Sequence, residues 1–420
     1  MGNLKDFFSV SSAKSAKGVV HKNNIIKRNI VALMALTGES TLSELTRKLN
    51  VSVPTITKLV QELVDEDILT DLGKVETSGG RRPNIFGLAS SAIYFVGVSV
   101  GRTRLIYLLM DLHNNVVEEL SDPDFELVDS AACLEQICSG IERFVDGCGV
   151  DRAKIMGVGV SVTGRVNPET GRSYKYFTDM GLSMCEVVEK RVGIRVLLEN
   201  DTRARCFAEY LCDGPDLLAA GGDVEAPGGS AAERNVLYLH LGLGVAIGII
   251  TDGKLYYGKS GFAGEFGHIP LFDNDLICAC GKKGCLETEV SGVALERKLR
   301  SAIDQGVNTI LSGSGSVSVE DIVAAAKRDD NLSIELIAEI GAKVGRAMAY
   351  LINIFNPESV VIGGAIAEAG DCIMLPMMAA VNRYSLGLVY KDTQFRLSTM
   401  GDSANALGVA MLMRNKILDI

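Results

Sequence analysis

The sequence of 420 residues predicts an α/β protein with two similar lobes, preceded by a small helical domain. Apolar residues recur at helical spacing in the first 90 residues, whereas apolar strand patterns dominate from Ile93 onward. The strand pattern that begins near residue 94 recurs near residue 236, and such a duplication implies two related lobes. The length agrees with two or three domains, because single domains commonly contain ~100–200 residues.

The first 20 residues are rich in Ser, Lys and Ala and are expected to form a flexible arm. Residues 21–90 are predicted to form the small domain. Two helices are expected first, over residues 22–37 and 41–50, because both stretches place apolar side chains on one helical face. These apolar residues are Ile25, Ile26, Ile30, Leu33, Met34, Leu42, Leu45 and Leu49.

A third helix is predicted to begin at Ser52, a suitable N-cap, with Pro54 in its first turn. Its buried face is expected to contain Ile56, Leu59, Val60 and Leu63. Its outer face carries side chains of the kind that reach phosphates and base edges in a DNA major groove. The predicted DNA-binding residues here are Ser52, Thr55, Thr57, Lys58 and Gln61.

Residues 68–88 predict a two-stranded hairpin with a flexible basic tip, Gly79-Gly80-Arg81-Arg82-Pro83. Three helices followed by a hairpin are typical of a winged helix-turn-helix. Arg81 and Arg82 suit entry into a narrow minor groove, so they complete the predicted DNA-binding set. A small helical dimerisation module is the alternative, and the basic wing argues against it.

The distribution of charge agrees with this assignment. Residues 1–90 contain 12 Lys/Arg and 9 Asp/Glu, whereas residues 91–420 contain 30 and 43. An acidic body repels nucleic acid, so contact with double-stranded DNA is assigned to the N-terminal domain. Ordinary surface variation is the alternative explanation of this asymmetry.

The composition indicates a cytoplasmic protein. No apolar run reaches the ~18–20 residues that a membrane helix needs. The N-terminus lacks the apolar core of a signal peptide. The ten cysteines show no disulfide framework, which favours a reducing compartment in which thiols stay free or bind metal.

Residues 91–420 are predicted to form the two-lobed body. Strands joined by tight turns are expected over residues 94–117 and again over 236–257, with helices and strands alternating around both copies. This alternation is typical of an α/β architecture with a cleft between its lobes. Residues 213–234 are Gly/Ala-rich without periodicity and are expected to form a mobile surface insertion.

One histidine and three cysteines gather between residues 268 and 285. The spacing of His268, Cys278, Cys280 and Cys285, with glycines between them, suits a closed tetrahedral zinc site of structural type. Four unrelated residues are the alternative. It is disfavoured because the other cysteines are dispersed and the chain has four histidines in all.

Two glutamates flank this loop, Glu265 before His268 and Glu287 after Cys285. Carboxylates beside a rigid metal loop are well placed to accept hydrogen bonds from sugar hydroxyls. One nitrogen of His268 can bind zinc while the other donates outward. The loop is therefore predicted to stiffen one wall of a polyol-binding cleft, the alternative being two solvated surface glutamates.

At this point the chain resembles the ROK family of repressors, open reading frames and sugar kinases. The resemblance covers residues 92–415, and the N-terminal domain with its SGGRRP tip resembles the family's repressor branch, which responds to sugars such as xylose or N-acetylglucosamine. The kinase branch lacks that domain. The matching stretches are GEFGH (264–268), CACGKKGCLE (278–287), LLENDTRA (197–204), GVGVSVTGRVNPETG (157–171) and NPESVVIGG (356–364).

The resemblance implies a duplicated actin-like, ribonuclease H-like sugar-kinase fold and a set of site residues. Asp201 matches the base that takes the hydroxyl proton in kinases. Thr163 stands where many members have proline, beside a predicted backbone contact. The implied sugar-binding residues are Gly164, Asn200, Asp201, Glu265, His268 and Glu287, and the implied zinc ligands are His268, Cys278, Cys280 and Cys285.

Departures from the kinase pattern concern the nucleotide. Kinases of the family have Asp-x-Gly-Gly-Thr at the first turn, where this chain has residues 99–103, SVGRT. Their second phosphate turn is Gly-Thr-Gly-x-Gly, where this chain has residues 242–246, GLGVA. Leu243 cannot hydrogen-bond phosphate, and Ala246 restricts close backbone approach. Phosphoryl transfer depends on positioning the nucleotide, so catalytic activity is predicted to be absent.

The sequence therefore favours a sugar-responsive transcriptional repressor that binds operator DNA as a homodimer or homotetramer, with a sugar or sugar phosphate as effector. An active sugar kinase carrying a DNA-binding domain is the alternative, supported by Asp201 and opposed by Ser99 and Leu243. A DNA-binding scaffold without a ligand is the third hypothesis. The complete set of sugar-contacting residues argues against it.

Overall fold

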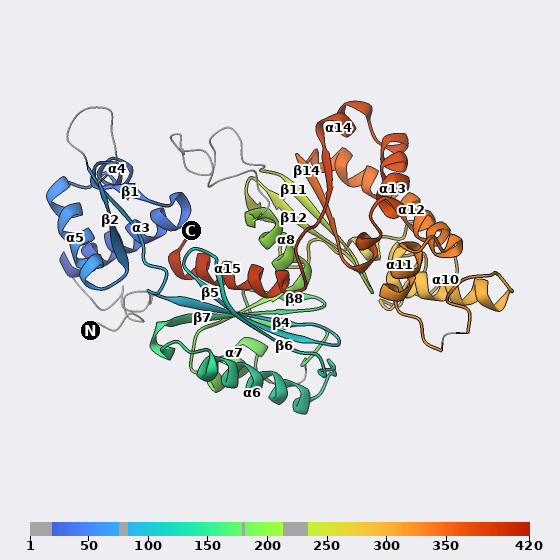
Figure 1. Ribbon diagram of the computed structural model, residues 1–420, viewed down its shortest axis with the longest axis horizontal. Helices are drawn as coiled ribbons and strands as arrows, with labels where there is room; N and C mark the ends of the chain where they lie inside the picture. The colour runs from blue at the N-terminus through green and yellow to red at the C-terminus, as the bar shows by residue number, and fades with distance from the viewer. Residues whose placement is uncertain (1–18, 75–82, 179–180, 213–233, 314) are drawn as a thin grey trace. The chain divides into compact units, whose positions relative to one another are not determined.

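The computed structural model describes residues 19–74, 83–178, 181–212, 234–313 and 315–420 (Figure 1). The chain forms two compact units. The first contains residues 1–232 together with 402–420, and the second contains residues 233–401. Among the described residues, no helix is long and apolar enough to cross a membrane.

Three helices begin the described chain: α3 (Val19–Thr37), α4 (Leu42–Leu49) and α5 (Val53–Asp65). Thr41 caps α4 through a capping box with Glu44, because its hydroxyl accepts from the Glu44 N–H and the Glu44 carboxylate accepts from the Thr41 N–H. The predicted face of α5 is fully buried. On α3, Ile25 is 43% exposed although its spacing matched the buried positions, because Ile26 and Ile30 take the inward face.

A three-stranded sheet in the order β1-β3-β2 accompanies these helices, formed by β1 (Ser40–Thr41), β2 (Leu69–Lys74) and β3 (Asn84–Leu88). The antiparallel pair β2 and β3 is the predicted hairpin. Its basic tip, including Arg81 and Arg82, lies outside the described residues. The winged helix-turn-helix is thus present in its helices and its strands.

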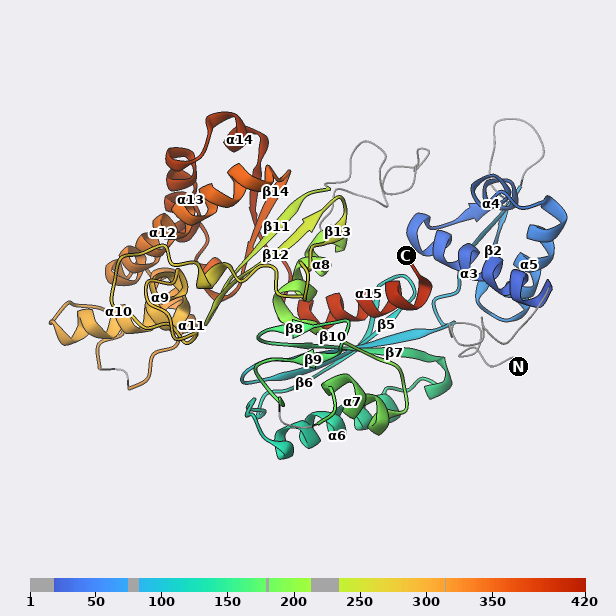
Figure 2. The same ribbon diagram turned by 180° about the vertical axis from the view of Figure 1, so that it is seen from behind.

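The rest of the first unit is built on a five-stranded sheet in the order β10-β7-β4-β5-β6. Helices α6 (Ala131–Gly147) and α7 (Met184–Val192) cover one face, and α15 (Ala404–Leu418) covers the other (Figure 1 and Figure 2). Helix α8 (Asp201–Cys212) packs against α15. The strands are β4 (Tyr94–Val100), β5 (Leu105–Asp111), β6 (Val116–Asp122), β7 (Ile155–Val162) and β10 (Val196–Asn200), with a separate ribbon of β8 (Val166–Asn167) and β9 (Arg172–Ser173).

Glycines in the central strands allow α15 to lie directly on the sheet. A Cβ atom added at Gly159 of β7 would lie 2.3 Å from the carbonyl oxygen of Val409, and one at Gly97 of β4 would lie 2.0 Å from that of Ala406. Atoms at such distances overlap, so a larger residue at either position would push the helix away. The C-terminal segment therefore completes the core of the first unit.

The second unit repeats the topology of the first. Its sheet has the order β13-β12-β11-β14-β15, with an antiparallel β11–β12 pair and parallel β11–β14 and β14–β15 pairs. The corresponding pairs of the first sheet have the same directions. The strands are β11 (Val236–Leu241), β12 (Val245–Thr251), β13 (Lys254–Leu255), β14 (Ser359–Gly363) and β15 (Gln394–Leu397).

The long helix α12 (Asn331–Phe355) packs against α13 (Asp371–Tyr384), and both belong to the apolar core of this unit. The remaining helices are α9 (Glu287–Val290), α10 (Gly292–Asp304), α11 (Val319–Ala326) and α14 (Gly387–Asp392). The matching strand orders confirm the predicted duplication. The predicted insertion at residues 213–234 falls almost entirely on residues 213–233, outside the described part of the chain.

Candidate functional site

The predicted zinc ligands come together in the second unit. The ligand atoms of His268, Cys278, Cys280 and Cys285 all lie within 4.8 Å of one another. The Sγ atom of Cys278 lies 3.4 Å from Nδ1 of His268, and the Sγ atoms of Cys280 and Cys285 are 3.6 Å apart. Ligands at the usual Zn–S and Zn–N distances of a tetrahedral site lie roughly 3.5–3.8 Å apart. The four side chains therefore fit one tetrahedral metal ion.

Short backbone contacts shape this loop. Cys278 donates its N–H to Lys282 at 2.8 Å, and Gly281 donates to Cys278 at 2.8 Å, which closes a tight turn between two ligands. Gly284 has φ +73°, and a Cβ atom there would lie 2.1 Å from the carbonyl oxygen of Phe272. Only glycine meets both requirements, so the loop is built around this position.

Without a metal ion, the surroundings of Cys278, Cys280 and Cys285 do not stabilise the deprotonated form of all three thiols. Burial raises the pKa of the Cys278 thiol to about 12 and also raises the pKa of Cys285. By contrast, a hydrogen bond from the backbone of Lys282 lowers the pKa of Cys280. A metal ion bound at this site would displace the protons of the Cys278 and Cys285 thiols, because metals bind cysteine as the thiolate.

The carboxylates beside the loop have different surroundings. Glu287 is half-buried, and its Oε2 accepts a hydrogen bond from the backbone N–H of Val245 at 3.1 Å. Glu265 is exposed, and its Oε2 lies 3.8 Å from Nε2 of His268. Thus Nδ1 of His268 faces Cys278 while Nε2 faces Glu265.

Three further predicted residues meet in the first unit. The side-chain amide of Asn200, at the end of β10, donates to the carbonyl of Gly164 and to Oδ1 of Asp201, each at 2.9 Å. Oδ1 of Asp201 also accepts from the backbone N–H of Thr202 at 2.7 Å, at the start of α8. The Gly164 loop beside Thr163 has φ +96° at the glycine. These hydrogen bonds fix the orientation of the Asn200 amide and of the Asp201 carboxylate.

These two groups of residues lie in different units of the chain. Gly164, Asn200 and Asp201 form one hydrogen-bonded set, and Glu265, His268 and Glu287 surround the metal-ligand cluster. Each set is complete within its own unit.

In the two turns that differ from the kinase pattern, backbone N–H groups donate hydrogen bonds to other groups of the protein. Ser99 is buried within β4, and Gly101 donates its N–H to Arg104 at 3.0 Å. In the second turn, Gly242 donates to Gly244 at 3.1 Å, and Leu243 is 40% exposed. The N–H of Val245 in this turn already donates to a carboxylate, that of Glu287.

The predicted DNA-binding residues of α5 lie on its outer face, with Thr57, Lys58 and Gln61 exposed and Thr55 half-buried. Ser52 occupies the N-cap position, but its side chain makes no capping hydrogen bond. Its hydroxyl pairs with the hydroxyl of Thr55 at 2.8 Å instead. Ser52 and Thr55 therefore form one polar patch at the start of the helix.

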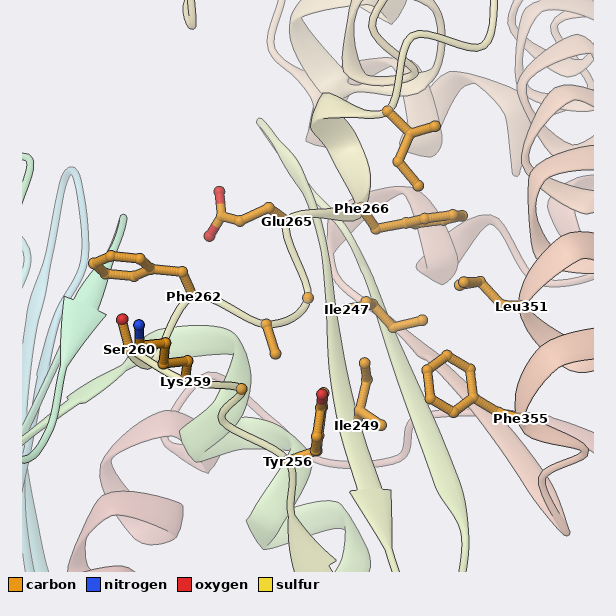
Figure 3. Close-up of a pocket in the computed structure, with 14 residues that line it drawn as sticks. Ile247, Ile249, Tyr256, Lys259, Ser260, Phe262, Glu265, Phe266, Leu351 and Phe355 are labelled. Atoms are coloured by element: carbon orange, nitrogen blue, oxygen red, sulfur yellow. The ribbon is translucent and has the colours of Figure 1, made fainter.

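A pocket of about 550 Å³ in the second unit was not predicted from the sequence (Figure 3). Apolar side chains of β12 and α12, including Ile247, Ile249 and Phe355, line one side. The carboxylate of Glu265 points away from Phe355 (Figure 3). The remaining lining comes from the segment between β13 and the metal loop, which has no periodicity that would indicate a cavity wall.

A buried ion pair next to Asn200 was also not predicted. Glu199 is 1% exposed and Arg203 is 4% exposed, and their Oε1 and Nε atoms are 2.7 Å apart. A charged residue at the end of the apolar stretch VLLE was the available signal, because buried charges need partners.

Comparisons with known proteins agree with the observed architecture. The ROK family profile matches residues 95–416, and a profile described as winged helix-turn-helix DNA-binding matches residues 23–70. Residues 1–18 lie outside both matches and outside the described structure.

Curated relatives come from both functional branches. The DNA-binding transcriptional repressor Mlc of Escherichia coli K12 is 27% identical over 383 residues, covering 89% of this chain and 89% of Mlc. A glucokinase of Halalkalibacterium halodurans is 27% identical over 331 residues, covering 77% of this chain and 96% of the glucokinase. Of these two, the repressor match is the one that extends over the N-terminal domain as well as the body.

A solved structure described as a ROK family transcriptional regulator, homologous to the E. coli Mlc protein, has a TM-score of 0.77 and 27% identity. The match covers 94% of this chain and 97% of that one. The predicted fold class and the predicted resemblance to the repressor branch are therefore confirmed.

Proposed function

Because this chain belongs to the ROK family and carries a winged helix-turn-helix, we propose that it is a sugar-responsive transcriptional repressor that binds operator DNA. The observation that carries the proposal is the combination of both parts in one chain, aligned over 89% of its length with the repressor Mlc. The effector is a sugar or sugar phosphate bound by the body. The protein acts in the cytoplasm as a homodimer or homotetramer.

DNA binding is assigned to the first 90 residues, with residues 21–90 as the domain and residues 91–420 as the sugar-binding body. Helix α5 presents Thr57, Lys58 and Gln61 to solvent, where they can enter a major groove. Lys58 contributes a cation toward phosphate, although Glu62 lies 3.8 Å from its Nζ. The threonines, with Ser52, offer short hydroxyls suited to base edges.

Sugar contacts are assigned to Gly164, Asn200 and Asp201 in the first unit and to Glu265, His268 and Glu287 in the second unit. The carboxylates of Asp201, Glu265 and Glu287 and the side-chain oxygen of Asn200 are groups that can accept hydrogen bonds from the hydroxyls of a polyol. Each set is pre-organised by its own unit, which reduces the entropy that a bound sugar must offset. A ligand that binds one conformation of the protein more tightly than another shifts the population toward that conformation, which is the requirement for an allosteric effector.

The metal is assigned as structural zinc. A His/Cys₃ set with all four positions filled by the protein leaves no open coordination position. Zinc bound there would supply charge that stabilises the thiolates and would fix the backbone on both sides of the loop. His268 would then be held by Nδ1, and Nε2 would stay available for hydrogen bonding beside Glu265.

Phosphoryl transfer is not part of the proposed function. Ser99 offers no carboxylate near a magnesium nucleotide, and Leu243 offers no hydrogen bond to phosphate. The Glu287 carboxylate on the N–H of Val245 adds negative charge at the second turn, which disfavours an anionic ligand there. Asp201 then accepts a hydrogen bond from the sugar instead of acting as a base.

A panel of sugars and sugar phosphates tested by thermal shift is the first experiment. A ligand at 100 times its dissociation constant stabilises a protein by about 2.7 kcal/mol, which is readily detected. ATP consumption with the sugar that binds tests the alternative function. Turnover at roughly 1–100 per second would identify an active kinase that carries a DNA-binding domain.

A further inference from the structure

The ion pair between Glu199 and Arg203 is the most buried pair of opposite charges beside the proposed sugar site. Glu199 lies directly before Asn200 in β10, and Arg203 lies in the first turn of α8. Their side chains are 1% and 4% exposed. Among the described residues, Oε2 of Glu199 accepts no hydrogen bond. Charges removed from water in this way are costly, and apolar residues of similar volume often stabilise a fold equally well.

The pair touches every element that carries the first-unit sugar residues. Oε1 of Glu199 accepts the backbone N–H of Asn200 at 2.7 Å as well as Nε–H of Arg203. The backbone N–H of Arg203 donates to Oδ1 of Asn200 at 3.0 Å. The amide nitrogen of the same Asn200 side chain donates to Gly164 and Asp201.

Arg203 also holds the loop that contains Gly164. Its Nη2 donates to the carbonyl oxygen of Val166 at 3.0 Å, two residues beyond Gly164. The planar guanidinium thus spans the end of β10 and the start of β8, because Nε and Nη2 donate in fixed directions. The loop is then tied at two points, by Asn200 at Gly164 and by Arg203 at Val166.

We propose that the Glu199–Arg203 pair positions the sugar site: it fixes the Gly164–Val166 loop against Asn200 and Asp201 in the arrangement that binds a polyol. The inference rests on the proposed function of that site. Neither residue contacts the ligand in this account, so both are positioning residues. Their removal is expected to change sugar affinity more than it changes stability.

The decisive variant is the double substitution Glu199→Gln with Arg203→Met. The side-chain carbonyl of the new glutamine still accepts the N–H of Asn200, no charge stays buried without its partner, and the guanidinium tie to Val166 is lost. The full-length protein is titrated with D-glucose, D-xylose and N-acetylglucosamine by calorimetry. The expected result is a loss of affinity of ~10–100-fold, the range seen when groups that orient a binding residue are removed. The unfolding midpoint, zinc content and sugar-free DNA binding are expected to stay close to those of the wild type.

Two further variants keep the test decisive. Arg203→Lys retains a cation beside Glu199, but the single nitrogen of an ammonium cannot take the positions of both Nε and Nη2, so this variant should also lose affinity. The matched control is Arg205→Met with Glu209→Gln, the second buried pair, which lies farther along α8. This control should bind the sugar within about twofold of the wild-type affinity, whatever its effect on stability.

The outcomes are distinguishable. Suppose that the wild-type protein binds a sugar and that the double variant and the Arg203→Lys variant bind it with affinities within about twofold of the wild-type value. The positioning role is then wrong, and the proposed function still stands. A wild-type protein that binds no sugar or sugar phosphate overturns the proposed function, and this inference with it.

Discussion

Two glycines of the metal loop allow the rigidity of that loop to be tested by one matched pair of substitutions. Gly281 and Gly284 both have positive φ, +84° and +73°. A Cβ atom at Gly281 meets nothing within 4 Å, whereas one at Gly284 would lie 2.1 Å from the Phe272 carbonyl oxygen. Alanine at either position incurs the cost of a left-handed backbone, about 1–2 kcal/mol. At Gly284 the overlap must also be relieved by backbone movement, which adds about 1–3 kcal/mol.

The difference between Gly284→Ala and Gly281→Ala therefore isolates the packing of the loop. In a unit of this size, 1 kcal/mol shifts the unfolding midpoint by ~2–4 °C, so Gly284→Ala should unfold ~2–12 °C below Gly281→Ala. Calorimetry of the full-length protein measures the midpoints, and metal analysis measures the zinc retained after dialysis against a weak chelator. Gly284→Ala should also lose more metal. Equal midpoints and equal metal contents for the two variants would refute a loop built around Gly284.

Three further predictions concern other parts of the molecule. The Nζ atom of Lys343 lies 2.6 Å from a carboxylate oxygen of Glu289 and 2.6 Å from one of Glu339. Lys343→Met should therefore lower the free energy of unfolding, measured by chemical denaturation, by about 1–3 kcal/mol. The control Lys327→Met removes an exposed lysine 4.0 Å from Glu368 and should leave that free energy unchanged. Burial alone would raise the pKa of Glu289, but the hydrogen bonds and charges of Lys343 and Lys298 outweigh burial and lower this pKa below 4.5. The stabilisation that these ion pairs provide should therefore be present above pH 4.5 and fade as the pH falls below it. An unchanged acid unfolding midpoint in Lys343→Met would contradict this coupling. In the DNA-binding domain, Lys58→Ala should weaken binding across sequences and reduce the salt slope by about 0.9, measured by fluorescence anisotropy at several salt concentrations, with Lys327→Ala as the control. A slope equal to that of the wild type would remove Lys58 from the phosphate contacts. Finally, Asp201→Asn should weaken the sugar response while ATP consumption stays absent in both proteins, and measurable turnover in the wild type would reverse this expectation.

Much of the architecture follows from local patterns in the sequence. The buried face of α5 follows a period of 3.6 residues, and the apolar strands that begin near residues 94 and 236 are visible as a repeated local pattern. These features depend on neighbours close in the chain, so periodicity is sufficient to predict them. The four metal ligands were predictable for a related reason, because three of them lie within eight residues of one another and His268 lies ten residues before the first.

Features that depend on distant contacts could not be predicted in this way. Arg203 meets the carbonyl of Val166, 37 residues away, and no spacing rule connects those positions. The pocket requires residues of β12 and α12 that are far apart in sequence. Ser52 shows a subtler limit, since its type and place suited an N-cap, yet its hydroxyl pairs with Thr55. The choice between two local hydrogen bonds depends on side-chain rotamers, which the sequence pattern does not contain.

The proposed function requires that one chain couples sugar binding to operator binding, and one titration tests this coupling. The full-length protein is allowed to select DNA from a random pool, and its affinity for the selected sequence is then measured by fluorescence anisotropy with and without the sugar that stabilises it. Saturating sugar is expected to change the DNA dissociation constant by ~5–150-fold, the usual range of allosteric coupling. An unchanged affinity for the selected DNA at saturating sugar would rule out this coupling.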